Sequence, residues 1–422
     1  MGTHKDAPSS TPSEYTPRAC LTLLGAFCGM FCTVGFMNSF GVFLEYYKTA
    51  QLSNESESTI AWLAALVIFF IFGVSVISGP LLDTFGPRLL LCTGSIGTVF
   101  AIMMTSLCKQ FYQFILAQGI LLGISLSLLT CPMIALVGQH IKIKRGAAIG
   151  IVIAGSSLGG VVWPIVVHEL LQKPNIGFGW TMRTVGFIML PLLVITCVCC
   201  QPPQTIPPSP ETPSSTPNQP TATTTTAKDP SILHSKPLQL TCLAFFLIYF
   251  GMFSPFFYTT SYAIAHGFSS NLSFYTISII NGASLFGRIF VGIIADKYGR
   301  FNCCVIFTLL SGIIALCWTK ATDVAGLVVF AAAYGFTSGA ILSLQQACAL
   351  QLATPRTVGL AVGVVMASTA LSAMAGIPIS GELIQKYGYL ALSIYSGVSL
   401  LVGGVVLGVA RGMQNWGVGV VV

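Results

Sequence analysis

Long apolar stretches follow one another along almost the whole chain, and they constrain its fold more than any other feature of the sequence. A helix needs about 20 apolar residues to cross a bilayer core about 30 Å thick. The stretches are continuously apolar and do not alternate with polar residues, which favours helices over the strands of a membrane barrel. Only 7% of the residues are charged and the mean hydropathy is +0.83. The sequence therefore predicts an all-α membrane protein.

The hydropathy pattern divides the chain into two groups of six predicted spans. The first group, within residues 19–200, is predicted at 19–45, 59–82, 89–107, 111–137, 146–171 and 182–200. The second group, within residues 237–411, is predicted at 238–265, 272–294, 303–318, 326–350, 358–384 and 388–410. We therefore expect 12 transmembrane helices, with short cytosolic tails at residues 1–18 and 412–422.

Residues 201–236 separate the two groups and consist largely of Pro, Thr and Ser. Such a segment cannot bury enough apolar surface to offset the entropy of ordering, so we expect a disordered linker. An even number of spans places both tails and this linker on one side. If that side is cytosolic, it carries about twice as many Lys and Arg residues as the outer side, as the positive-inside rule requires.

Two sequons begin at Asn54 and Asn271, on the predicted outer side. Both are therefore candidate glycosylation sites. Each lies close to a predicted helix end, so an unglycosylated loop asparagine is the alternative interpretation.

One short pattern, Gly-x3-Asp-x2-Gly, occurs at corresponding places in the two groups of spans. The two copies contain Gly79, Asp83, Gly86 and Arg88, and Gly292, Asp296, Lys297, Gly299 and Arg300. Glycine permits close helix approach and tight turns, and an aspartate can accept hydrogen bonds from a neighbouring helix N-terminus. The first copy departs from the pattern at Thr84 and Pro87, so a plain connecting loop is the alternative there.

This duplicated pattern resembles the cytosolic signature between the second and third helices of the major facilitator superfamily. The resemblance implies two six-helix parallel repeats with a binding region near the bilayer midplane, and a gating role for the two signature copies. Three further segments, at residues 38–43, 144–160 and 281–288, look like the fungal monocarboxylate-porter-like branch. The acidic residue followed by glycine that usually opens the first helix of monocarboxylate porters is absent, since Arg18 and Ala19 lead directly into apolar sequence.

Arg288 is the only strongly basic residue well inside a predicted span, about two helical turns before Asp296. A cation in a membrane usually lines a cavity or pairs with a carboxylate, because burying it alone is costly. The resemblance implies an aspartate one turn before the arginine, where this chain has Ser284. Contact with an anionic or polar substrate is one hypothesis for Arg288; snorkelling or pairing within a cytosolic gate is the other.

Other polar residues inside predicted spans complete the candidate substrate-binding set: Asn38, Asn281, Tyr334 and Gln345. An interhelical hydrogen bond is the more common role of such residues in membrane helices. The sequence shows no phosphate loop, nucleophile elbow or metal-binding helix pattern, so we expect no enzymatic activity, cofactor or metal. The net charge of +7 comes from scattered residues, which argues against nucleic acid as a partner.

The functional hypothesis is secondary active transport of a small organic molecule by alternating access. The resemblance favours efflux of a fungal secondary metabolite; the alternatives are uptake of a monocarboxylate or related nutrient, and a non-transporting membrane sensor. The expected partners are a small-molecule substrate and the lipid bilayer, with coupled protons as a further candidate. We expect a multi-pass protein of the plasma membrane with both termini cytosolic; an intracellular membrane is the alternative location.

Overall fold

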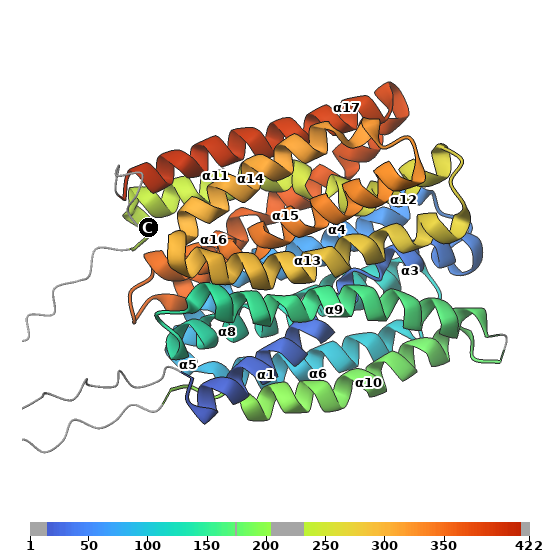
Figure 1. The fold of residues 1–422 in the computed structure, drawn as a ribbon. Helices are drawn as coiled ribbons and strands as arrows, with labels where there is room; N and C mark the ends of the chain where they lie inside the picture. Colours follow the sequence, from blue (N-terminus) through green and yellow to red (C-terminus); the bar gives the residue numbers. More distant parts are fainter. Residues whose placement is uncertain (1–14, 174, 204–231, 415–422) are drawn as a thin grey trace, which may run out of the picture.

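The computed structural model describes residues 15–173, 175–203 and 232–414, and within these ranges it contains helices and no strand. The helices run side by side in an elongated bundle (Figure 1). This arrangement confirms the all-α fold that the apolar stretches predict. Most of the predicted tails, and residues 204–231 of the predicted linker, lie outside the described residues. We use "first half" for the described residues up to 203 and "second half" for residues 232–414.

The first half contains more breaks than the sequence predicts. Residues 19–45, predicted as one span, are divided among three α-helices, and a π-helical segment follows them. The elements are α1 (Pro17–Cys32), α2 (Val34–Met37), α3 (Phe40–Tyr46), π-helical η1 (Tyr47–Gln51), α4 (Glu57–Gly73), α5 (Ser75–Phe85), α6 (Pro87–Thr105), α7 (Phe111–Phe114), π-helical η2 (Ile115–Leu121), α8 (Leu122–His140), α9 (Arg145–Gln172) and α10 (Gly177–Cys199).

The second half begins with a short 3₁₀ turn and continues through seven α-helices. Its elements are η3 (Ile232–His234), α11 (Lys236–Met252), α12 (Ser254–Ala265), α13 (Ser270–Tyr298), α14 (Arg300–Leu316), 3₁₀ segment η4 (Trp318–Lys320), α15 (Val324–Leu352), α16 (Val358–Ser368) and α17 (Ala370–Gly412). The predicted span at 238–265 is divided between α11 and α12, with Phe253 between them.

Ten segments of the described chain are long and apolar enough to cross a membrane. One of them, Val358–Gly412, contains Gly388 at a φ of 76°, where the sequence predicts a boundary between two spans. The helix Arg300–Leu316, at the predicted span 303–318, is apolar but shorter than the other ten. If the two parts of Val358–Gly412 are counted separately and α14 is included, the number of apolar segments reaches the 12 spans expected from the sequence. The number of membrane spans stays a prediction.

The break between α1 and α2 has a side-chain cause. Thr33 Oγ1 donates a hydrogen bond to the Gly29 carbonyl oxygen at 2.9 Å. Threonine bonding of this kind competes with the regular ladder and bends helices. Trp163 of α9 donates its indole N–H to the Phe31 carbonyl oxygen at 2.9 Å, just before the break. A partner from another helix therefore stabilises the backbone where the first predicted span bends.

A proline explains the corresponding break in the second half. Pro255 has no N–H group, so the Gly251 carbonyl one turn earlier loses its usual helical partner. Ser396 Oγ of α17 donates to that carbonyl oxygen at 2.7 Å. The Tyr334 hydroxyl of α15 donates to the next carbonyl oxygen, of Met252, also at 2.7 Å. Side chains from two other helices thus bind the carbonyl groups at this bend.

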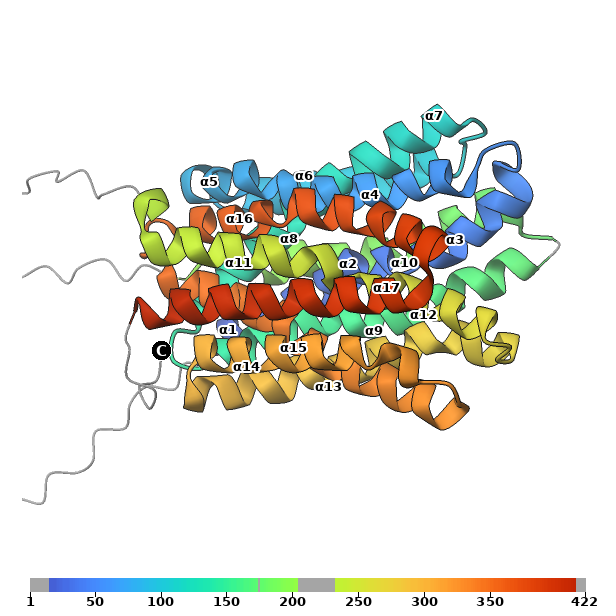
Figure 2. The same ribbon diagram turned by 90° about the horizontal axis from the view of Figure 1, so that it is seen from above.

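Several helix pairs join the halves, and the two most extensive of them bring together residues that are far apart in the sequence. Helix α13 lies beside α9 (Figure 1), and α16 lies beside α5 (Figure 2). The start of α1, the end of α10, the start of α11 and the end of α17 all lie at one end of the bundle (Figure 1). We call it the signature end, because both copies of the repeated pattern lie there.

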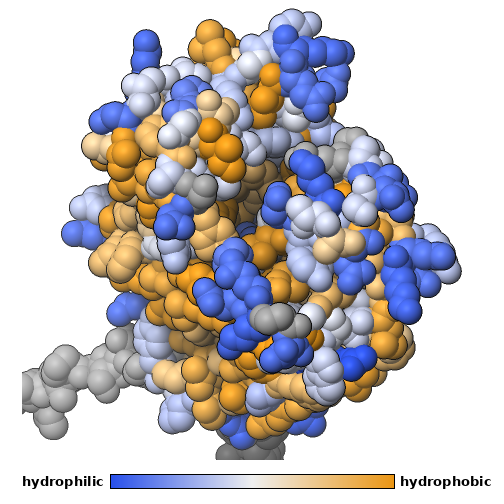
Figure 3. Space-filling model, turned by 90° about the vertical axis from the view of Figure 1, so that its right-hand side faces the viewer, coloured by the Kyte–Doolittle hydropathy of each residue, from blue (hydrophilic) through white to orange (hydrophobic). Residues whose placement is uncertain are grey.

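Large apolar side chains cover the outside of the bundle. Exposed examples from five different spans are Ile96, Phe187, Ile293, Val329 and Val405. Such a surface is suited to lipid, while the helical backbone satisfies its own polar groups. With the ten apolar segments, it identifies a multi-pass membrane protein. Figure 3 looks onto the end opposite the signature end, where polar residues surround a central hollow that contains apolar side chains.

Candidate functional site

A row of polar side chains on α13 faces α9. Asn281, Ser284 and Arg288 are three and four residues apart, which places them on one face of the helix. Ser157 of α9 donates a hydrogen bond to Ser284 Oγ at 3.3 Å. We call this contact between the halves the α9–α13 seam. It joins Asn281, Ser284 and Arg288 to the facing residues of α9.

Arg288 lies within the seam and is only 2% exposed. One terminal nitrogen, Nη1, donates to the Ile153 carbonyl oxygen of α9 at 2.6 Å and to Ser156 Oγ. No acidic side chain pairs with Arg288 among the described residues, and its buried Nε has no hydrogen-bond partner there. The guanidinium is therefore a buried cation whose Nη1 is held by neutral oxygens and whose Nε–H is unused.

Asn38 and Asn281 meet across the halves at the far end of this row. Asn38 Nδ2 donates to Asn281 Oδ1 at 3.4 Å, and Asn281 Nδ2 donates to the Ile277 carbonyl oxygen of its own helix at 3.0 Å. Gly160 of α9 makes room for them, since a Cβ there would lie 2.6 Å from Asn38 Nδ2. The structure thus brings together two of the predicted site residues.

Gln345 of α15 lies in a second buried polar group within the second half. Its Oε1 accepts a hydrogen bond from the Tyr249 hydroxyl of α11 at 2.6 Å, and its buried Nε2 has no partner among the described residues. The neighbouring Gln346 also has a buried oxygen, Oε1, without a partner there. Buried polar atoms without partners are uncommon in folded proteins. A ligand with donors and acceptors could satisfy these atoms.

Tyr334 is placed differently from the other predicted site residues. Its hydroxyl donates to the Met252 carbonyl at the α11–α12 break, and its ring stacks on Phe330 with 5.8 Å between centroids. The side chain is fully buried. Tyr334 therefore makes an interhelical hydrogen bond, which is the alternative role that the sequence suggests for it.

The second signature copy joins α13 to the N-terminus of α9. The Asp296 carboxylate accepts backbone N–H groups from Gly146 at 2.7 Å and from Ala147 at 2.8 Å. Carboxylates are favoured at helix N-termini, where backbone N–H groups are unpaired. Arg300 forms an ion pair with Asp296 at 3.2 Å and donates to the Ile143 carbonyl oxygen at 2.9 Å. Three parts of the chain therefore meet at this carboxylate.

The first signature copy makes the reciprocal contact. The Asp83 carboxylate accepts backbone N–H groups from Gly359 and Leu360, at the start of α16, each at 2.9 Å. Each half thus supplies a carboxylate to a helix N-terminus of the other half. We call these two contacts the signature latches.

The two latches differ because the arginine is displaced by one residue. Arg300 follows Gly299 directly and lies four residues after Asp296, whereas Pro87 occupies the corresponding place after Asp83. Arg88 is exposed and forms no hydrogen bond or ion pair with another described residue. One residue turns a helix by about 100°, so Arg88 begins at a different position around its helix from the one that Arg300 has in the second copy. Lys297 is exposed and lies 5.3 Å from the Tyr298 ring.

Glycines permit the close approach of the helices at both latches. Gly292 lies against the Gly146 carbonyl group, and Gly79 lies against that of Gly359, where an added Cβ would collide with backbone in each case. Gly86 and Gly299 have positive φ angles of 77° and 96° at the turns between helices. These geometries explain the four glycines of the repeated pattern.

The predictions from the sequence do not include the helix N-termini that bind the two aspartates. A signal was present, because the spacing Gly-x3-Gly occurs at Gly146 and Gly150 and recurs at Gly359 and Gly363. Gly150 packs against the Arg288 backbone carbonyl, and Gly363 against that of Ser75. Ser75 therefore occupies in the first half the place that Arg288 has in the second.

The two sequon asparagines lie at the opposite end from the latches. Asn54 is exposed in the loop between η1 and α4, and Asn271 is exposed in the first turn of α13. Their glycosylation stays a prediction.

The similarity of this chain to known proteins shows which family it belongs to. The family model described as Major Facilitator Superfamily matches residues 26–322. The chain belongs to the Major Facilitator Superfamily. The duplicated signature that predicted this membership is the pair of latches described above. The prediction of a monocarboxylate-porter-like branch within the superfamily goes beyond these findings.

Relatives and solved structures agree with this membership. The chain is 45% identical to the agnestins efflux protein AgnL12 of Paecilomyces divaricatus, over 96% of this chain and 89% of that protein. It is 38% identical to the aspyridones efflux protein apdF of Emericella nidulans, over 94% and 79% of the two chains. The fold is similar to that of the human organic anion transporter MFSD10, with a TM-score of 0.70, 16% identity, and coverage of 93% and 100%.

Proposed function

We propose that this protein is a secondary active transporter that exports a small organic molecule, a fungal secondary metabolite, by alternating access. The observation that carries the proposal is the reciprocal pair of signature latches at the signature end of the bundle. Each latch is made of a few hydrogen bonds between a carboxylate and a helix N-terminus. Contacts of this kind can break and reform as two rigid halves rock about a central site.

The polar residues between the halves support a central binding site. Arg288, Asn281 and Gln345 are each at most 2% exposed, so a substrate can reach them only when the halves separate. Arg288 would contribute the positive charge, and Asn38 and Asn281 would contribute hydrogen bonds. An anionic or strongly polar group on the substrate would satisfy the unused donors of Arg288 and Gln345. Tyr334 would support this site by fixing the bend of α11 and α12.

The relatives support export as the direction of transport and metabolites as the cargo. AgnL12 and apdF are named as efflux proteins for agnestins and aspyridones, and the chain matches most of the length of both. Monocarboxylate uptake is less well supported, because no acidic side chain of the described residues pairs with Arg288 and Ser284 stands one turn before it. Coupled protons are part of the proposal as the energy source.

The proposal includes the topology that the sequence predicts. The signature end would be cytosolic, with 12 spans in two six-helix repeats, at residues 19–200 and 237–411, and a linker at residues 201–236. Described Lys and Arg residues are concentrated at the signature end, as the positive-inside rule requires. We propose the plasma membrane as the location and no enzymatic activity.

The direct test compares producing cells with and without the gene. We expect its removal to raise the intracellular amount of one secondary metabolite and to lower the extracellular amount, as measured by mass spectrometry of both fractions. Re-expression of the wild-type chain should restore the ratio, and Arg288→Gln should not restore it. Unchanged amounts in both fractions would contradict export.

A reconstituted system separates a transporter from a sensor. Purified protein in liposomes loaded with the metabolite identified above should release it in a time-dependent way, faster with a proton gradient. Binding without release would contradict transport. Equal rates of release with and without the gradient would contradict proton coupling but would leave the proposed transport intact.

A further inference from the structure

An open groove lies on the side of the first half, away from Arg288. One wall comes from α6 and the loop after it, and the other wall comes from α7 and η2. Helix α7 lies at the end of the bundle away from the signature end (Figure 2). The groove has a volume of about 380 Å³, which is within the range of ligand sites in proteins. We call it the α6–η2 groove; its lining includes Phe100, Met104, Leu107, Gln113, Leu116 and Leu121.

The groove opens toward the surroundings of the bundle. Phe100, Leu107 and Leu116 each have more than half of their surface exposed. In a multi-pass membrane protein, exposed apolar side chains of this kind contact lipid. At a rise of about 1.5 Å per residue, Phe100 and Leu107 are separated by about 10 Å along the chain axis. The groove can therefore hold part of an extended acyl chain.

The internal repeat provides a reference for the groove. Gln110 is the N-cap of α7 and lies 24 residues after Gly86. Asp323 is the N-cap of α15 and lies 24 residues after Gly299. The equal spacing from the turns of the two signature copies shows that the N-caps occupy corresponding places in the two halves.

The first half contains one extra residue after this N-cap. Gly123 lies against the Val67 backbone, 13 residues after its N-cap, and Gly335 lies against the Ile280 backbone, 12 residues after its N-cap. Val67 and Ile280 each precede the first glycine of their signature copy by 12 residues, so the two contacts correspond. The π-helical segment η2 lies in this interval, whereas α15 is α-helical. The wider π-helical turns therefore accommodate the extra residue.

The second half fills the corresponding space with its own rings. Trp318 lies 19 residues after Gly299, and Thr105 lies 19 residues after Gly86. The Trp318 ring stacks on Phe330 of α15, with 5.6 Å between centroids and 7° between planes, and both side chains are buried. Thr105 is too small to supply such a ring. The first half thus leaves between α6 and η2 a space that the second half closes.

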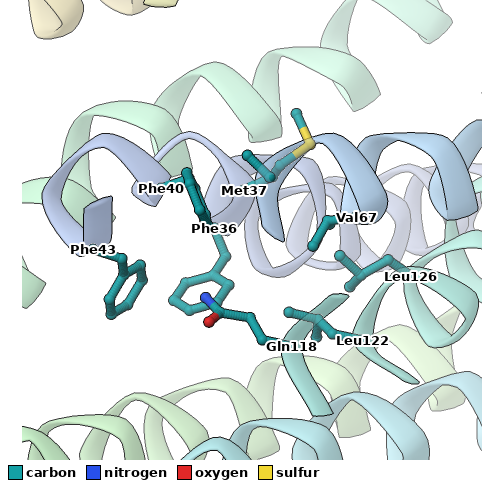
Figure 4. A pocket seen from close by; sticks show the side chains of 9 residues that line it. Phe36, Met37, Phe40, Phe43, Val67, Gln118, Leu122 and Leu126 are labelled. Atoms are coloured by element: carbon teal, nitrogen blue, oxygen red, sulfur yellow. The ribbon is translucent and has the colours of Figure 1, made fainter. Parts of the chain in front are cut away.

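The inner face of η2 is fixed within the bundle. Gln118 is 2% exposed, and its Oε1 accepts a hydrogen bond from the Tyr47 hydroxyl at 2.7 Å. Figure 4 shows the Gln118 amide beside the Phe36 ring. The small pocket around Gln118 has a volume of about 20 Å³, which is room for one water molecule. Of the spaces on the two faces of η2, the α6–η2 groove is therefore the one that can accept an acyl chain.

A basic residue lies at the mouth of the groove. The Lys109 backbone N–H donates to Gln113 Oε1 at 2.7 Å, which places Lys109 beside the lining. The Lys109 side chain is exposed and forms no ion pair or hydrogen bond with another described residue. Tyr112 is exposed next to it. Lysine and tyrosine are typical of the level of the lipid head groups, where an ammonium group attracts anionic lipid.

We propose that the α6–η2 groove binds an anionic phospholipid. One acyl chain lies against Phe100, Met104 and Leu116, and the phosphate accepts a hydrogen bond from the Lys109 ammonium group. The apolar walls match the chain, and the cation at the mouth matches the head group. The inference concerns the membrane-facing surface, so it rests on neither the proposed cargo nor the proposed direction of transport.

The test uses phosphatidylglycerol that carries a photoreactive diazirine in one acyl chain. The purified full chain in phosphatidylcholine vesicles with this probe is irradiated, and the labelled peptides are identified by mass spectrometry. Leu390, Ile394 and Val398 of α17 are the reference surface, because they are exposed and lie at least 14 residues from the signature end of this helix. We expect at least about threefold more label on residues 100–121 than on the reference, a preference that one exposed ion pair can supply.

Unlabelled lipids separate a specific site from general lipid contact. An excess of unlabelled phosphatidylglycerol should remove the difference between the groove and the reference surface, and added phosphatidylcholine should not. Equal labelling of the two surfaces would overturn the proposal, because it would indicate ordinary contact with the bilayer. Competition by cholesterol as strong as that by phosphatidylglycerol would also overturn it, because a sterol would then be the ligand.

Two variants test the chain and the head group separately. Ala117→Phe places a ring in the groove and should reduce its label to the level of the reference surface. Lys109→Gln should lower the preference for phosphatidylglycerol over phosphatidylcholine by about two- to fivefold, the range of an exposed ion pair. The matched controls are Val329→Phe and Lys320→Gln, exposed positions of the second half that should leave the label on the groove unchanged.

The melting temperature of each purified variant shows whether it is folded. An unchanged preference for the groove in folded Ala117→Phe, or in Lys109→Gln, would overturn the proposal. If Ala117→Phe does not fold, the competition experiment with the wild-type chain and the result for Lys109→Gln decide the question.

Discussion

The Asp296 carboxylate accepts the backbone N–H of Gly146 at 2.7 Å, although the two residues belong to opposite halves of the chain. Asp83 and Gly359 repeat this relationship at 2.9 Å with the halves exchanged. The two latches are alike in their hydrogen bonds and unlike in their surroundings, because only Asp296 has an arginine beside it. We therefore expect the latch at Asp296 to be stronger than the latch at Asp83.

Asp296→Asn should destabilise the protein more than Asp83→Asn. An amide oxygen can replace one acceptor of the carboxylate, but it loses the second acceptor and the charge. Hydrogen bonds to charged groups contribute about 1.5–3 kcal/mol, so we expect a loss of that order at Asp296. The loss at Asp83 should be smaller, because no arginine is paired with it. Thermal unfolding of the two purified variants checks this order; equal losses would contradict it.

Gly292→Ala should separate α13 from α9 at the signature end. The added methyl group would collide with the Gly146 carbonyl, and overpacking of this kind costs about 1–3 kcal/mol. Labelling of a cysteine introduced at the signature end should become faster as the latch loosens. Gly282→Ala on the same helix is the matched control, because nothing lies within 4 Å of its added Cβ. Similar labelling rates in the two variants would refute the close-packing argument.

Arg288→Gln should impair transport while leaving the fold intact. The loss of a charged donor to an anionic substrate corresponds to about a ten- to hundredfold fall in affinity. The folded protein should be as stable as the wild type or more stable, because replacing a buried unpaired cation removes a desolvation penalty. Export rate and melting temperature should therefore change independently. A large fall in melting temperature with normal affinity would favour a purely structural role.

Pro87→Arg should strengthen the weaker latch. It places an arginine four residues after Asp83, in the position that Arg300 has relative to Asp296. Pro87 is buried but Asp83 is exposed, and an ion pair with an exposed carboxylate contributes up to about 1 kcal/mol. We expect slower turnover, because the signature end would open less readily. Arg88→Ala provides the control and should have little effect, since Arg88 has no partner among the described residues. Faster turnover in Pro87→Arg would contradict the latch model.

Gly388→Ala should destabilise the second half. Gly388 has a φ of 76° and a ψ of −176°, a backbone conformation that is essentially restricted to glycine and costs other residues about 1–3 kcal/mol. Gly408→Ala, in the regular part of the same helix, should have no comparable cost, because its added Cβ would meet only an ordinary contact at 3.9 Å. The difference between the two melting temperatures measures the strain at Gly388.

Much of the fold could be predicted from residues that are close in the sequence. The apolar stretches predict helices in the regions where the ten candidate spans and α14 lie, and the repeated pattern contains Asp83 and Asp296. The apolar pattern does not predict the breaks in the first span and in 238–265, although the sequence contains Thr33 and Pro255 there. Both are stabilised by residues of other helices, Trp163 and Tyr334, whose proximity no local pattern reveals.

The sequence predicts which types of residue form the candidate site, but it predicts only part of their arrangement in space. Arg288 stands out in the sequence as an isolated charge, and it lies buried between the halves. Its role in substrate contact or in gating stays a prediction. Its partners on α9 were not foreseen, and neither was the pocket around Gln118. Gln118 is one polar residue in an apolar span, and only its contact with Tyr47 and the surrounding rings distinguishes it.

The sequence by itself determined that the chain is helical, that it suits a membrane and that it contains a duplicated signature, because apolar length and turn chemistry are properties of contiguous residues. The tertiary structure alone decided which helix N-terminus each aspartate binds, which oxygens surround Arg288 and where Gln118 points. These contacts join residues from distant parts of the chain. They depend on how complete helices pack, and glycine positions such as Gly146 and Gly359 set the separation at which they form.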